Sequence, residues 1–162
     1  MAELTTLEEK LAEVTGLAMA AQGATDKVSG LVEDDELKQT LQRMNAEAKE
    51  TEERCTQLAE ELDGKKTAVL DKARETKQEA TEMMKTYLGS DAEGLDGFEF
   101  LTMAEAGEVG HWEVLGVLGK RAAKSEVEAL VDWAVPIQQR HFQEALAGSM
   151  KLAMQEDPNG TG

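Results

Sequence analysis

Apolar residues recur in alternating steps of four and three along two long segments in the first part of the chain. In residues 6–32 the repeating positions are Leu7, Leu11, Val14, Ala18, Ala21, Thr25, Val28 and Val32. In residues 35–62 they are Leu37, Leu41, Met44, Ala48, Thr51, Cys55, Leu58 and Leu62. An α-helix places such positions on one face, and that face packs against matching faces of other helices in a bundle.

A second pair of amphipathic segments follows later in the chain. One is predicted from near Phe98 to near Ala123, and the other from Ser125 to about Leu152. Between the two pairs, residues 66–88 are highly charged and only weakly amphipathic, so we expect a peripheral helix or a long crossover arm there. Residues 89–97 are rich in Gly and Asp and are predicted to form a loop. This order predicts an all-α fold, an antiparallel four-helix bundle with a long helical crossover.

Length and charge limit the classes of protein that fit this chain. Its 162 residues suit one domain, which we expect to occupy residues 1–155, with a disordered tail at 156–162. The net charge of −16 argues against binding to nucleic acid or to an anionic membrane surface. There is no apolar run long enough to span a bilayer and no secretory signal pattern, so we expect a cytoplasmic protein.

The chain has two histidines, and each follows a polar residue by three positions on the apolar face of its predicted helix. His111 follows Glu108, and His141 follows Gln138. A step of three places the two side chains of each pair one above the other on the same helical face. Some four-helix bundles present Glu-x-x-His pairs inward in this way as metal ligands. The second pair carries an amide in place of the acid.

These pairs fall near the midpoints of the predicted helices, where the second helix offers glutamates at adjoining positions. Burial of a carboxylate and two imidazoles is unfavourable unless they pair with one another or bind a cation. We therefore predict a metal site in the bundle core. Its predicted ligands are Glu108, His111 and His141, with Gln138 and Glu50 in support. The alternative is a hydrogen-bonded polar layer without metal that only fixes the register of the helices.

Over residues 7–155 the sequence resembles a ferritin-like family and is similar to the stress-associated YciE and YciF type. The resemblance is strongest in residues 50–58, 105–115 and 133–141. Where the third bundle helix of the family typically shows Glu-His-Tyr-Glu, this chain has Gly110-His-Trp-Glu113. The resemblance implies a ferritin-like four-helix core that binds iron or a similar divalent metal.

Three positions depart from the pattern that the resemblance implies. Gln22 and Gln138 stand where the family has acids, and Arg54 stands where it usually has His or Gln. A complete di-iron site in such bundles uses about four carboxylates and two histidines. Because glutamine supplies an oxygen but no charge, we expect one metal ion or a degenerate site in preference to a working di-iron centre.

Two functional hypotheses follow. In the first, the protein is a ferritin-like metal-binding protein of metal homeostasis or the stress response, and two bound irons would add ferroxidase or peroxidase chemistry. In the second, it is a metal-free helical bundle that acts through homo-oligomerisation, as a dimer, or through another protein partner.

Overall fold

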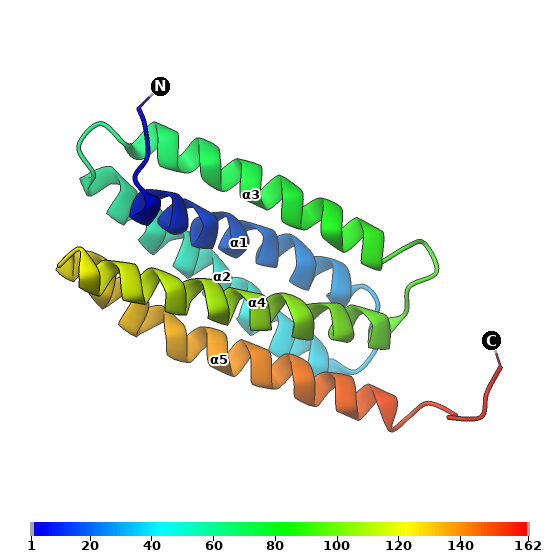
Figure 1. Ribbon diagram of the computed structural model, residues 1–162. Helices are drawn as coiled ribbons and strands as arrows, with labels where there is room; N and C mark the ends of the chain where they lie inside the picture. Colours follow the sequence, from blue (N-terminus) through cyan, green and yellow to red (C-terminus); the bar gives the residue numbers. More distant parts are fainter. Residues whose placement is uncertain (1, 162) are drawn as a thin grey trace.

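The computed structural model describes residues 2–161, and this range contains five α-helices and no strand (Figure 1). The helices are α1 (Thr6–Ser29), α2 (Asp35–Glu61), α3 (Lys66–Tyr87), α4 (Gly94–Arg121) and α5 (Ser125–Ala153). The predicted all-α class is confirmed. None of these helices combines the length and the apolar character needed to cross a bilayer. Beyond Ala153 the described residues form no further helix, and the predicted disorder of residues 156–162 stays a prediction.

Acidic residues mark the starts of two helices. The Asp34 carboxylate accepts a hydrogen bond of 3.0 Å from the backbone N–H of Leu37 at the start of α2. α4 begins at Gly94, earlier than the predicted start at Phe98. There the Asp96 carboxylate accepts a hydrogen bond of 2.8 Å from the N–H of Glu93. Side-chain partners of this kind stabilise a helix start, so the loop prediction for residues 89–97 is wrong at its C-terminal end.

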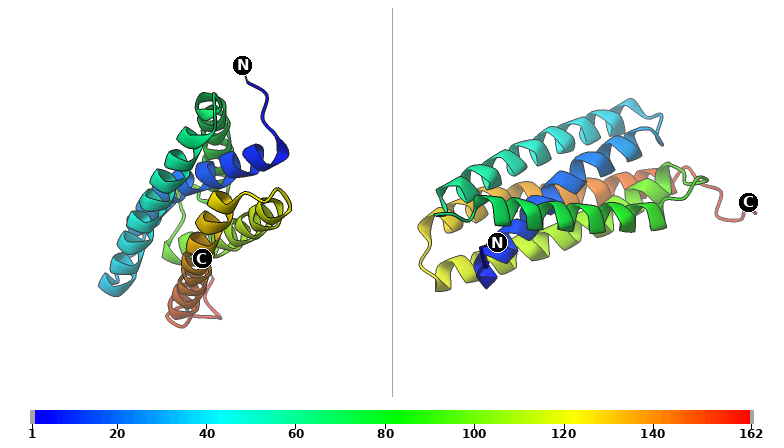
Figure 2. Two further views of the ribbon diagram at one scale, coloured as in Figure 1. Left: turned by 90° about the vertical axis from the view of Figure 1, so that its left-hand side faces the viewer. Right: turned by 90° about the horizontal axis from the view of Figure 1, so that it is seen from above.

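The helices form two antiparallel hairpins, α1 with α2 and α4 with α5 (Figures 1 and 2). α1 also packs on α4, and α2 packs on α5. The four helices therefore surround a common core, and each contacts its neighbour in sequence and one helix of the other hairpin. α3 runs back along the molecule from the end of α2 to the start of α4 (Figure 1).

α3 is more than a connection, because it packs extensively along α1. Its buried residues Ala68, Val69 and Ala73 all lie in its first half. At Gly16 of α1, an added Cβ would lie only 2.3 Å from the backbone carbonyl oxygen of Ala73. The two backbones can approach this closely only because residue 16 has no side chain. The second half of α3 is largely exposed.

Two large apolar clusters lie in the bundle core, one towards each end, and a small third one joins α1, α2 and α3 through Ala12, Ala59 and Val69. The first surrounds Phe98, whose ring lies directly against Gly148. The second surrounds Trp112, which is 1% exposed. Along α4 the first cluster ends at Leu101 and the second begins at Trp112. Between them on α4 lie the two buried glutamates, Glu105 and Glu108, while Ala104 still packs against the first cluster.

Candidate functional site

A polar layer lies between the two apolar clusters. We use this name for five side chains from α2, α4 and α5: Glu47, Glu105, Glu108, Gln138 and His141. All of them are buried except Glu47, whose side chain is 20% exposed. Buried acids and imidazoles are rare unless they are paired, so the contacts within this layer decide what it can do.

The packing of α4 on α5 sets the order of the layer. His141 of α5 lies opposite Glu105 of α4, with 3.7 Å between imidazole Nδ1 and carboxylate Oε2. Because the two helices are antiparallel, one turn along them brings Glu108 to the level of Gln138. The two three-residue steps, Glu105 to Glu108 and Gln138 to His141, therefore face each other across the same interface.

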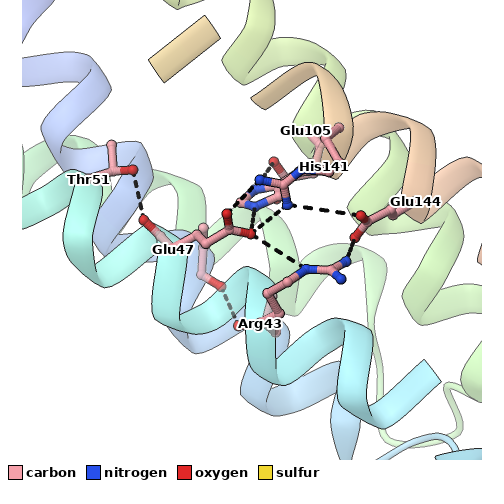
Figure 3. Close-up of polar contacts among 9 residues, drawn as sticks. Arg43, Glu47, Thr51, Glu105, His141 and Glu144 are labelled. Atoms are coloured by element: carbon pink, nitrogen blue, oxygen red, sulfur yellow. Dashed lines mark hydrogen bonds and ion pairs between the residues drawn. The ribbon is translucent and has the colours of Figure 1, made fainter. Parts of the chain in front are cut away.

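His141 connects three helices (Figure 3). Its Nε2 lies 3.1 Å from Oε1 of Glu47 on α2, and its Nδ1 forms the ion pair with Glu105 on α4. Burial alone lowers the pKa of His141, but Glu105 and then Glu47 outweigh that effect and hold the pKa above its ordinary value. A protonated imidazole has an N–H on both ring nitrogens and can face both carboxylates at once.

Glu47 is the most strongly paired acid of the layer. Arg140 donates two hydrogen bonds to its carboxylate, of 2.7 Å and 2.6 Å, in a bidentate geometry. These bonds, followed by the bond from His141, lower the pKa of Glu47 to about 2 despite its partial burial. Arg43 adds a longer ion pair of 3.7 Å and also contacts Glu144 of α5 (Figure 3). This network joins α2 to α5 at the edge of the layer.

Glu105, Glu108 and Gln138 are less well satisfied. Oε2 of Glu105 and Oε1 of Gln138 are buried and have no hydrogen-bond partner. Burial raises the pKa of Glu108 well above its usual range, and the nearby Glu105 carboxylate raises it further. Buried oxygens without a hydrogen bond are uncommon in folded proteins, and each is unfavourable by about 1–3 kcal/mol. Oε2 of Glu105 keeps only its 3.7 Å ion pair with His141. The layer therefore has a saturated side at Glu47, where both carboxylate oxygens accept hydrogen bonds, and an unsatisfied side at α4, where the buried oxygens are not all hydrogen-bonded.

The prediction that His111 points into the core is wrong. Its side chain is 45% exposed and pairs with Glu13 of α1, with 3.3 Å between Nδ1 and Oε2. The next residue, Trp112, occupies the core position instead. Both residues fit the apolar stripe of α4, and the indole removes far more apolar surface from water than an imidazole does.

Glu50 also lies outside the layer. It is exposed and pairs with Arg54 across one turn of α2, at 3.1 Å. The Arg54 guanidinium lies 4.1 Å from the ring centroid of Trp133, so it points away from the core. Of the five predicted ligands, Glu108, Gln138 and His141 are buried, on α4 and α5.

The glutamate that α2 does contribute is Glu47, and α4 contributes Glu105 as a second acid. Neither was among the predicted ligands. No signal in the sequence singles out Glu47, because its partner Arg140 is 41% exposed and does not require a carboxylate on the facing helix. In α4, either Ala104 or Glu105 fits the repeating position that faces the core, and the spacing of apolar residues does not decide between them.

The donor set does not fit a di-iron centre, which uses about four carboxylates and two histidines. One histidine faces the layer, and Glu47 is already held by Arg140. In residues 2–161, no group of three or more His, Cys, Asp or Glu side chains is arranged to hold a metal ion. The carboxyl groups of Glu105 and Glu108 and the amide oxygen of Gln138, all buried, have the chemistry that one hard divalent cation prefers.

Comparisons with known proteins add no further assignment, since no protein-family model, no curated protein and no solved structure matches this chain.

Proposed function

We propose that this protein is a ferritin-like helical bundle that takes up one divalent cation, such as ferrous iron or Mn²⁺, and serves metal homeostasis or the stress response. The observation that carries the proposal is that Glu105 and Gln138 each bury an oxygen without a hydrogen-bond partner, in the layer that also holds the desolvated carboxyl of Glu108. The arrangement of α1, α2, α4 and α5, with α3 as a helical crossover, supports the ferritin-like assignment.

A cation would resolve the electrostatic conflict on the α4 side of the layer. Glu105 and Glu108 lie three residues apart on one face, so their carboxylates repel each other when both are ionised. One divalent ion would stabilise both negative charges and would be coordinated by the amide oxygen of Gln138. Nδ1 of His141 would complete a mixed oxygen and nitrogen set, after small movements of these side chains.

The test is a metal titration of chelator-treated protein with Mn²⁺, followed by isothermal calorimetry and by electron paramagnetic resonance of the bound ion. The proposal expects about one ion per chain, with affinity lowered at least tenfold by Glu105→Gln and by Glu108→Gln. Glu50→Gln is the matched control, because Glu50 is an exposed glutamate on α2. No binding, or binding that Glu105→Gln leaves unchanged, would refute the cation site.

A second function is favoured by a different observation, the saturated side of the layer. Glu47, Arg140 and His141 satisfy one another without any ion, which suits a metal-free bundle whose polar layer only fixes helix pairing. Such a protein would act as a homodimer, and the exposed Val114 and Val117 of α4 are its candidate contact residues. Sedimentation equilibrium of wild type and of Val117→Glu tests this function. A monomer at all concentrations would refute it.

A further inference from the structure

A cavity of about 230 Å³ lies between α1, α3 and α4, on the side of α4 that carries Glu105 and Glu108. Its walls are mostly apolar. α1 contributes alanines, α3 contributes methionines, and α4 contributes a phenylalanine and a leucine. The main wall residues are Ala20, Ala24, Met83, Met84, Phe100 and Leu101. Alanines leave room for a guest molecule, and methionines adapt to its shape.

The same cavity is also lined by Glu105 and Glu108. They are 1% and 4% exposed, and Oε2 of Glu105 makes no hydrogen bond, only an ion pair of 3.7 Å with Nδ1 of His141. An apolar chamber lined by two buried carboxyl groups has the features of a ligand site: hydrophobic walls for affinity and a few polar groups for orientation. His111 also lines the cavity, but its Nδ1 already faces Glu13.

We propose that this cavity binds a small amphipathic ammonium compound, a primary amine on a short alkyl chain or a single ring. The ammonium group donates hydrogen bonds to Glu105 and Glu108, and the hydrocarbon part lies among the alanines of α1 and the methionines of α3. An anion of the same size is excluded because two acids line the cavity. The volume is below the range of about 300–1,000 Å³ that is usual for drug-sized ligands, so the ligand is small.

This inference does not depend on metal uptake, but the two ligands share Glu105 and Glu108 and therefore compete. The apolar walls distinguish the two ligands. A metal ion gains no binding free energy from apolar walls, whereas an alkyl chain gains about 0.8 kcal/mol for each methylene that it buries. If the affinity for alkylammonium ions increases with the length of the alkyl chain, the chain must therefore be bound inside the cavity.

The test is a titration of metal-free protein with methylammonium, hexylammonium and hexanoate, followed by calorimetry and by NMR shifts of the methionine methyl groups. We expect hexylammonium to bind at least tenfold more tightly than methylammonium, with shifts at Met83 and Met84, and we expect no binding of hexanoate. Equal affinity for the two amines, or binding of hexanoate, would overturn the proposal.

A pair of glycines in α4 supplies matched variants. Gly107 lines the cavity, Gly110 does not, and an added Cβ meets nothing within 4 Å at either position. Gly107→Leu fills the cavity and should weaken hexylammonium binding at least tenfold, whereas Gly110→Leu should leave it unchanged. An equal effect of both variants would also overturn the proposal. Mn²⁺ titration of Gly107→Leu distinguishes the two proposals. If this variant loses amine binding but still binds Mn²⁺, the cation site is unaffected.

Discussion

The ends of the bundle and its middle are held together by different chemistry. At each end, a cluster of apolar side chains surrounds one large aromatic ring, Phe98 in one cluster and Trp112 in the other. In the middle, four buried polar side chains occupy positions where the same heptad pattern would accept leucine. The ends contribute the hydrophobic free energy of folding, whereas the middle buries two oxygens without hydrogen bonds, which oppose it.

This difference separates the contacts of the layer that are complete within the protein from those that a ligand could complete. A polar layer that served only helix register would gain stability from complete pairing, as the contacts of Glu47 with Arg140 and His141 show. Oε2 of Glu105 and Oε1 of Gln138 instead have no hydrogen-bond partner, and Glu105 lines a cavity together with Glu108. Structural features that destabilise the folded state without a local compensating contact are expected at ligand sites.

The largest expected effect is at the apolar end around Trp112. Trp112→Ala leaves a cavity in a cluster where the indole is 1% exposed, and it should lower the free energy of unfolding by about 3–5 kcal/mol. Trp133→Ala is the control, because Trp133 is only partly buried and stacks on Arg54. Urea denaturation measures both variants, and an equal loss in the two would contradict the assignment of Trp112 to the core.

The contact of α1 with α3 gives the next effect. Gly16→Ala would drive a methyl group against the carbonyl oxygen of Ala73, and we expect a loss of about 2–3 kcal/mol from this overpacking. Gly23→Ala is the matched control on the same helix, since an added Cβ there meets nothing within 4 Å. It should stabilise the protein by up to about 1 kcal/mol through helix propensity. Destabilisation by Gly23→Ala as large as that by Gly16→Ala would show that helix packing is not the cause.

Glu47→Gln tests the saturated side of the polar layer. The variant loses the charged contacts to Arg140 and His141, and it should be destabilised by about 2 kcal/mol at pH 7. The folded pKa of Glu47, about 2, lies below its ordinary value of 4.5, so this stabilisation is present above pH 4.5 and is lost as the pH falls towards 2. The stability difference between wild type and variant should therefore shrink over that interval. A difference that stays constant with pH would contradict the pairing.

The helices themselves could be predicted from the sequence because their cause is local. Steps of four and three fix which face of a helix is apolar, and the predicted extents of α2 and α3 agree closely with the structure. The start of α4 was missed because Asp96 and Glu93, which look like loop residues, form a helix start. Their role depends on backbone geometry and not on composition.

The candidate site could be predicted only in part, because two adjacent residues of a helix can both fit the same repeating position that faces the core. At residues 111 and 112 either side chain satisfies the spacing, and the packing of α4 against its neighbours decides for the tryptophan. The choice of Glu47 over Glu50 in α2 depends on Arg140 of another helix. Contacts between helices set these orientations, and they are not encoded in the periodicity of either helix alone.

Glu108→Gln should change stability in the opposite direction from Glu47→Gln. The pKa of Glu108 is raised in the folded state, so the wild type loses stability as the pH rises above the ordinary value of 4.5 and the buried carboxyl group is driven to ionise. A neutral amide of the same shape removes that penalty, and we expect a gain of about 1 kcal/mol at pH 8 in metal-free protein. Thermal unfolding compares it with Glu113→Gln, an exposed change on the same helix. A loss of stability in Glu108→Gln would mean that the carboxylate is paired in the folded protein.

The smallest expected effect separates the two histidines. His111 is 45% exposed and its partner Glu13 lies at the surface of α1, so His111→Ala should change the free energy of unfolding by less than about 0.5 kcal/mol. Its Mn²⁺ affinity should match that of wild type, because His111 is not in the polar layer. Glu13→Gln serves as the companion variant, since it breaks the same ion pair from the other helix. A strong loss of metal by His111→Ala but not by Glu13→Gln would place the imidazole among the ligands and would require α4 to turn His111 inward in the loaded protein, at the expense of the burial of Trp112.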